Sequence, residues 1–163
     1  MSTYQTNDAV LYISEGVCKI EDIQTKDFFN EQRRYYVLRP IYHAGATVFV
    51  PCEGVALQKM HPIVKSAKSI TEHLQSTPAE PWMESDPQRK LHFRTLIDNG
   101  TLQKRVGVYK AILEKERALQ EQKKHLRTQD ERYKKELERL LIEELSAVCG
   151  KDPVETEELL KTV

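Results

Sequence analysis

The residues with the clearest chemical potential lie in the middle of the chain, where a single tryptophan precedes a run of cations. Trp82 is the only tryptophan among the 163 residues. The cations that follow recur at one-turn spacing and then as a pair: Arg89, Lys90, Arg94, Lys104 and Arg105. Cations spaced in this way on helices can contact successive phosphates, and a flat aromatic ring beside them can stack on nucleic-acid bases. These residues indicate a candidate nucleic-acid interface.

Each of these features also has a purely structural interpretation. A tryptophan in a linker commonly fills the seam between two domains, and cations on one side of a helix commonly form a solvated face. Lys123, Lys124, Arg127, Lys134 and Lys135 lie among Glu and Gln residues. We interpret this second group of cations as a solvated face.

The distribution of charge supports a local polyanion site. The whole chain is neutral, with 25 Lys and Arg against 25 Asp and Glu. Residues 86–135 nevertheless carry 14 basic against 7 acidic side chains, whereas residues 136–163 carry 3 against 8. The middle of the chain can attract DNA, but the whole molecule should bind it weakly and need a second anchor.

Patterns that would indicate an enzyme or a metal site are missing from the sequence. The five histidines are dispersed, and there is no HExxH motif and no glycine-rich phosphate loop. The three cysteines are far apart and form no CxxC pair, so we interpret them as reduced structural thiols. We expect no catalytic activity, no cofactor and no bound metal.

The first part of the chain has the pattern of a small β domain. Short β-forming runs at residues 9–13, 35–38 and 47–50 are bounded by glycine and proline, and a polar connection is predicted over residues 26–33. Four or five such strands favour a small barrel of the SH3 or Tudor type. We place this domain at residues 1–58.

Helical periodicity dominates the second part, residues 59–163. Helices are predicted over residues 66–75, from Asp86 to Gly100, over residues 102–122, from a Thr128–Glu131 capping box to Gly150, and after Asp152. Residues 125–128 interrupt any continuous coiled coil, which favours an antiparallel helical hairpin. The predicted fold class is α+β, with a β-barrel followed by a compact all-α domain.

Several segments of the N-terminal part resemble the CarD/CdnL family of bacterial transcription regulators. Val10-Leu11-Tyr12, Glu15-Gly16-Val17, Ile20-Glu21, Tyr35-Tyr36-Val37-Leu38 and Thr47–Pro51 follow the order of that family's opening pattern. The module is also similar to the polymerase-interacting domain of transcription-repair coupling factor. The tryptophan, the basic helix and the long helical hairpin extend the resemblance over nearly the whole chain.

The resemblance implies a Tudor-like domain that docks on the β subunit of RNA polymerase, and a helical domain that contacts promoter DNA at the upstream edge of the −10 region. Lys26, Phe49 and Pro51 match the polymerase-binding positions by this resemblance. Trp82 matches the residue that wedges into the minor groove where the transcription bubble begins. Phe49 stands where some members have a basic residue, and about four extra residues separate Trp82 from the basic helix.

The expected function is stabilisation of the open promoter complex with little sequence specificity. One alternative is an adaptor that binds RNA polymerase without touching DNA, and another is an RNA-binding protein of the Tudor or SH3 type. The N-terminus lacks a signal-peptide pattern and no apolar run approaches the roughly 18 residues that cross a bilayer, so we expect a cytoplasmic protein. We also expect a monomer.

Overall fold

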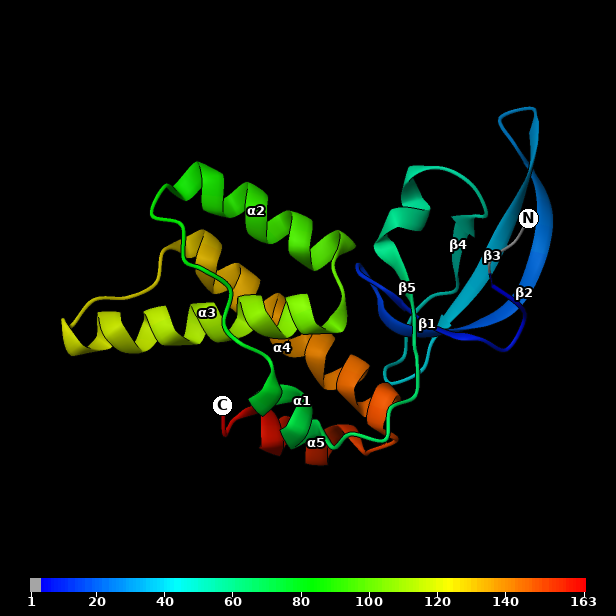
Figure 1. The fold of residues 1–163 in the computed structure, drawn as a ribbon. Coiled ribbons are helices and arrows are strands. Elements are labelled where there is room, and N and C mark those ends of the chain that lie inside the picture. Colours follow the sequence, from blue (N-terminus) through cyan, green and yellow to red (C-terminus); the bar gives the residue numbers. More distant parts are fainter. Residues whose placement is uncertain (1–3) are drawn as a thin grey trace. The chain divides into compact units, whose positions relative to one another are not determined.

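The chain forms two compact units. The structure, a computed structural model, describes residues 4–163, and its units divide after Val64. In the described residues, the first unit contains a five-stranded antiparallel sheet and the second contains five α-helices (Figure 1). The predicted α+β class is confirmed. The division falls later than residue 58 because Met60–Pro62 adds a strand beside the first one.

The β unit is built from neighbouring antiparallel strands. They are β1 (Ala9–Tyr12), β2 (Gly16–Phe28), β3 (Glu31–Pro40), β4 (Val48–Pro51) and β5 (Met60–Pro62), and a short 3-10 helix, η1 (Val55–Lys59), precedes β5. The strand order in the sheet is β4-β3-β2-β1-β5, so β4 and β5 are its edges. Gly16 has a φ of 93° at the tight β1–β2 connection, a conformation that costs glycine little.

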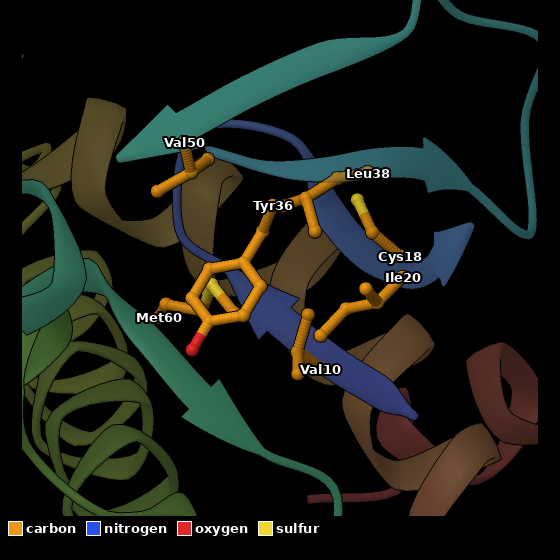
Figure 2. Packing of buried hydrophobic residues seen from close by; sticks show 7 residues of the cluster. All are labelled: Val10, Cys18, Ile20, Tyr36, Leu38, Val50 and Met60. Carbon is orange, nitrogen blue, oxygen red and sulfur yellow. The ribbon is translucent and has the colours of Figure 1, made fainter. Parts of the chain in front are cut away.

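One face of this sheet carries the hydrophobic core of the unit. Successive side chains of a strand point to opposite faces, so alternate residues of β2 and β3 reach the core. Figure 2 shows the cluster, which consists of Val10, Cys18, Ile20, Tyr36, Leu38, Val50 and Met60. All seven are almost completely buried. On the other face, Phe28 and Phe49 are exposed, whereas Val17 and Val37 are buried.

The polar connection predicted over residues 26–33 is wrong, because these residues form a β-hairpin. β2 and β3 remain paired out to Phe28 and Glu31, and only Phe29 and Asn30 form the turn. Both turn residues have positive φ, 55° and 62°, as in the type I′ turns that connect twisted strands. The hairpin extends past the other strands of its sheet (Figure 1).

The helical unit follows the predicted order of helices. It contains α1 (Ile70–Ser76), α2 (Asp86–Asn99), α3 (Leu102–Glu121), α4 (Thr128–Cys149) and α5 (Pro153–Leu160). The hydroxyl of Ser85 accepts a hydrogen bond from the Gln88 amide at the start of α2, and Gly100 ends that helix. Asp152 caps α5 by accepting from the Val154 amide. Gly150 ends α4 in the left-handed conformation.

Two details of the predicted helices differ. The first begins at Ile70 after the capping residue Ser69, because the hydroxyl of Ser69 accepts from the Glu72 amide. The capping box expected at Thr128 is not formed. Arg127 occupies the capping position of α4 without a side-chain cap bond.

The long helices α3 and α4 form the centre of the helical unit (Figure 1). Their facing apolar side chains are fully buried at Val106, Ile112, Leu137, Leu141 and Leu145. Residues 122–127 connect the two helices. The two helices therefore form the predicted helical hairpin and not a continuous coiled coil.

His73 on α1 makes the stability of this unit depend on pH. Burial lowers the pKa of its imidazole below the usual value near 6.5, and the nearby Lys68 acts in the same direction. The unfolded chain therefore binds the proton more readily, so the stability due to neutral His73 is lost as the pH falls through 6.5 towards the folded-state pKa. Between pH 8 and pH 5.5, the free energy of unfolding measured with urea should fall more for the natural chain than for His73→Gln. An equal fall in both proteins would contradict this assignment.

Candidate nucleic-acid interface and docking face

The linker between α1 and α2 is fixed on α3, and this positions Trp82. The Lys110 ammonium donates to the carbonyls of Leu74 and Thr77, at 2.9 and 2.6 Å. Further on, the Glu80 amide donates to the Gly107 carbonyl at 3.0 Å. A side chain at Gly107 would lie only 3.1 Å from the linker, so glycine permits the close approach. The linker is thus held along α3 up to the residues just before Trp82.

The Trp82 ring is clasped between two helices. The guanidinium of Arg89 lies 4.4 Å from the ring centroid, and the ammonium of Lys115 lies 5.6 Å from it. The edge of Phe93 completes the contact, with ring centroids 5.8 Å apart and planes at 73°. Cation–π and edge-to-face contacts of this kind restrict an aromatic ring. Trp82 is half-buried, so part of a rigidly held ring reaches the surface.

A cleft of about 500 Å³ opens beside this ring. Its cationic lining includes Lys115 of α3 and Lys124 and Arg127 of the α3–α4 connection. The carboxylates of Glu84, Asp86 and Asp130 also line it, and Asp86 pairs with Arg127 at 3.1 Å. The cleft therefore has an aromatic wall at Trp82 and a rim of both charges with a slight excess of cations.

Two of the predicted DNA-binding arginines are structural. Arg89 is buried and donates through Nε and Nη2 to the Asp130 carboxylate at 3.0 and 2.7 Å. Arg105 is buried in the same way on Glu144, at 2.8 and 2.6 Å. The hydrogen bond from Arg89 to Asp130 also holds the pKa of that guanidinium above its usual value. Burial and paired carboxylates remove both arginines from the set of residues available to a phosphate.

The other predicted cations differ in how accessible they are. Arg94 is half-buried and bonded to Glu136 and Asp98, at distances between 2.6 and 2.9 Å. Lys104 is exposed but pairs with Glu80 at 3.0 Å. Lys90 is exposed, and no carboxylate of residues 4–163 lies within ion-pair distance of it. Lys90 is thus the best placed of the predicted cations to meet a phosphate.

Three cations outside the predicted set lie near Trp82. Lys115, Lys124 and Arg127 line the cleft, whereas the sequence pattern indicates a solvated face for Lys124 and Arg127. They are separated from Trp82 by more than thirty positions, so spacing along the chain carries no signal for them. The sequence predicts that one helix ends near residue 122 and that the next begins at Thr128. This predicted loop is the signal that could have located Lys124 and Arg127.

The three predicted docking residues share the outer face of the sheet. The Lys26 ammonium lies 5.7 Å from the centroid of the Phe49 ring, and Phe49 is 41% exposed. Phe49 pairs with Val37, and Pro51 pairs with Tyr35 two residues further along the same strands. A cation from β2 therefore lies over the aromatic ring at position 49 of β4. Together, Lys26, Phe49 and Pro51 form what we call the docking face.

Other kinds of site find no support in the described part of the chain. Residues 4–163 contain no group of three His, Cys, Asp or Glu side chains placed to hold a metal ion. Among the same residues, no helix is both long enough and apolar enough to span a membrane. The described residues offer two separate candidate sites, the docking face on the β unit and the Trp82 cleft on the helical unit.

The β unit is similar to a known family of CarD-like domains. Residues 4–64 match the family described as CarD-like/TRCF RID domain, which confirms the resemblance drawn from the sequence. Across 154 residues the chain is also 27% identical to a protein of Bacillus subtilis (strain 168) named "Putative transcription factor YdeB". That similarity covers 90% of this chain and 93% of the relative. It therefore extends over the helical unit as well.

Proposed function

We propose that this protein joins RNA polymerase to promoter DNA and stabilises the open complex. The observation that carries the proposal is the pairing, in one chain, of a polymerase-interacting domain with a clasped tryptophan beside the exposed cations Lys124 and Arg127. The proposed polymerase contact is the β subunit, reached through the docking face. The proposed DNA contact is the upstream edge of the −10 region, reached through Trp82 and the cations around it.

The docking face suits a protein partner. It combines an exposed aromatic ring with a cation, and its strand β4 is a sheet edge that offers unpaired backbone groups. Aromatic residues and cations are enriched at the centres of protein interfaces. A partner bound there would raise the local concentration of the helical unit near DNA, so a weak DNA surface would suffice.

The DNA surface that we propose differs from the one read from the sequence. It contains Trp82, Lys90, Lys115, Lys124 and Arg127, and it omits Arg89 and Arg105. Arg94 and Lys104 lie at its margin, because each is paired with a carboxylate outside the cleft. Arg127 is also paired, with Asp86, but it lines the cleft itself. A ring that fits only the opened minor groove favours the open state by its differential affinity. About 1.4 kcal/mol of such preference shifts the open–closed equilibrium tenfold.

Loss of the Phe49 side chain should weaken polymerase binding. Phe49→Ala removes an exposed ring from the docking face, and burying a ring of this size is worth about 1.5–3 kcal/mol, so we expect binding to weaken at least about tenfold. Ile41→Ala is the matched control, since Ile41 is 48% exposed but lies beyond the other end of β3. The affinity of each full-length variant for immobilised core polymerase measures both effects. Equal affinity of Phe49→Ala and the natural chain would rule out this docking face.

The adaptor alternative is favoured by one observation. Four of the six predicted DNA-binding residues, Arg89, Arg94, Lys104 and Arg105, are ion-paired with carboxylates of the helical unit. A helical unit neutralised in this way could contact another protein instead of DNA. DNase footprinting of polymerase on a linear promoter distinguishes the two functions. Added protection just upstream of the −10 region supports the bridge, and an unchanged footprint with polymerase bound supports the adaptor.

A further inference from the structure

The tip of the β2–β3 hairpin presents an aromatic residue that the β unit does not need for its own packing. Phe29 is 100% exposed, and Phe28 beside it is 43% exposed. Behind them, Phe28 meets Tyr35 edge to face, with ring centroids 5.3 Å apart and planes at 89°. The tip is thus an aromatic group braced on a paired, two-stranded stem.

The backbone at this tip is also unfavourable for phenylalanine. Phe29 has a φ of 55°, in the left-handed region that Gly and Asn adopt easily and bulky residues rarely adopt. Two-residue hairpin turns of this geometry prefer Asn-Gly or Asp-Gly. Neither burial nor turn conformation accounts for phenylalanine at this position, and residues held in strained backbone conformations cluster at ligand contacts.

The hairpin continues the outer face of the sheet that carries the docking face. Residues paired across antiparallel strands lie on the same face, and the pairs are Phe28 with Glu31, Lys26 with Arg33, and Tyr35 with Pro51. Phe28 therefore shares one side of the sheet with Lys26 and Pro51. An aromatic stripe extends from the hairpin tip to the edge strand β4.

The charge of this unit favours a protein partner over a nucleic acid. Residues 1–64 carry 6 basic against 7 acidic side chains, which is a poor surface for a polyanion. Near the tip, Arg33 is already paired with Glu31 at 2.6 Å. An exposed aromatic group with little net charge is what an apolar pocket on a protein would receive.

We propose that Phe29, supported by Phe28 and Tyr35, is a second anchor that inserts into an apolar pocket of the protein bound at the docking face. This inference rests on the proposed function, because it takes RNA polymerase as that protein. The two anchors would contact the same partner at separate points. Their combined effect would be a slower dissociation than the docking face alone provides.

Two substitutions in the turn separate binding from turn stability. Phe29→Asn removes the ring and places a residue suited to positive φ, so the midpoint of thermal unfolding should rise by about 2–4 °C while polymerase binding weakens about tenfold. Asn30→Gly is the matched control, because it relaxes the neighbouring turn position and keeps Phe29. Its unfolding midpoint should also rise, and its binding should stay unchanged. Both are measured on the full chain with core polymerase, beside Phe49→Ala and the natural chain.

The outcomes distinguish the anchor from the proposed function. Weaker binding of Phe29→Asn with a raised unfolding midpoint supports the anchor. Unchanged binding of Phe29→Asn, with Phe49→Ala weakened, overturns the anchor and leaves the docking face in place. No polymerase binding by the natural chain overturns both. A loss confined to DNA binding, or to self-association of the chain, also overturns the anchor, because the partner would then be of another kind.

Discussion

Arg105→Met should lower the free energy of unfolding by about 3–5 kcal/mol, the usual cost of leaving one member of a buried ion pair without its partner. The side chains of Arg105 and Glu144 are only 1% and 4% exposed. Methionine would leave the Glu144 carboxylate buried without its two hydrogen bonds. The carbonyls of Ile97 and Gly100, which Arg105 also satisfies, would lose a donor. Urea unfolding followed by circular dichroism measures the change.

A double substitution tests whether the unpaired charge causes this loss. Arg105→Met combined with Glu144→Leu removes both charges, so much of the lost stability should return. Lys104→Met is the surface control, since the Lys104 side chain is 52% exposed and its pair with Glu80 should contribute about 1 kcal/mol. If the double variant is less stable than Arg105→Met alone, hydrogen bonding to the carbonyls outweighs the buried charge, and our explanation fails.

The order of strands and helices could be predicted because local signals in the sequence agree with the packing. The β-forming run from Tyr35 to Leu38 lies in β3, and Pro40 ends that strand. Gly100 and Gly150 end helices as expected. The hairpin over residues 26–33 escaped prediction because both of its faces are largely exposed there. Without a buried face, a strand has no alternation of apolar and polar residues to recognise.

The candidate site was predicted less well, for a reason that concerns distance along the chain. Arg89, Arg94 and Arg105 look like a basic cluster when only neighbouring residues are considered. Their carboxylate partners on α4 lie 41, 42 and 39 positions away and become visible only in the fold. The local partners Asp86 of Arg89 and Asp98 of Arg94 lie within one helical turn, so that part of the neutralisation could be read from the sequence. The reverse applies to Lys115 and Lys124, which the fold brings to Trp82. The family resemblance assigns Lys26 and Phe49 to polymerase binding. In the sheet, the Lys26 ammonium lies over the Phe49 ring.

Trp82→Ala should shorten the lifetime of the open promoter complex about thirtyfold, since aromatic residues at the centres of interfaces contribute about 2 kcal/mol or more. The clasp supports this expectation, because a ring already held by Arg89, Lys115 and Phe93 loses little entropy when it meets DNA. Polymerase binding through the docking face should stay unchanged. Lifetime is measured on a linear promoter with purified holoenzyme after addition of competitor DNA.

Trp82→Phe and Leu91→Ala separate this contact from the packing of the helical unit. Trp82→Phe keeps an aromatic ring against Phe93 but is smaller, so the lifetime should be intermediate. Leu91→Ala removes an apolar side chain on α2 that is 71% exposed, and it should have no effect. An unchanged lifetime with Trp82→Ala, despite normal polymerase binding, would leave Trp82 as a packing residue of the helical unit. DNA contact would then depend on the cations Lys90, Lys115, Lys124 and Arg127, which predicts a steep loss of the effect with added salt, because such contacts release counterions.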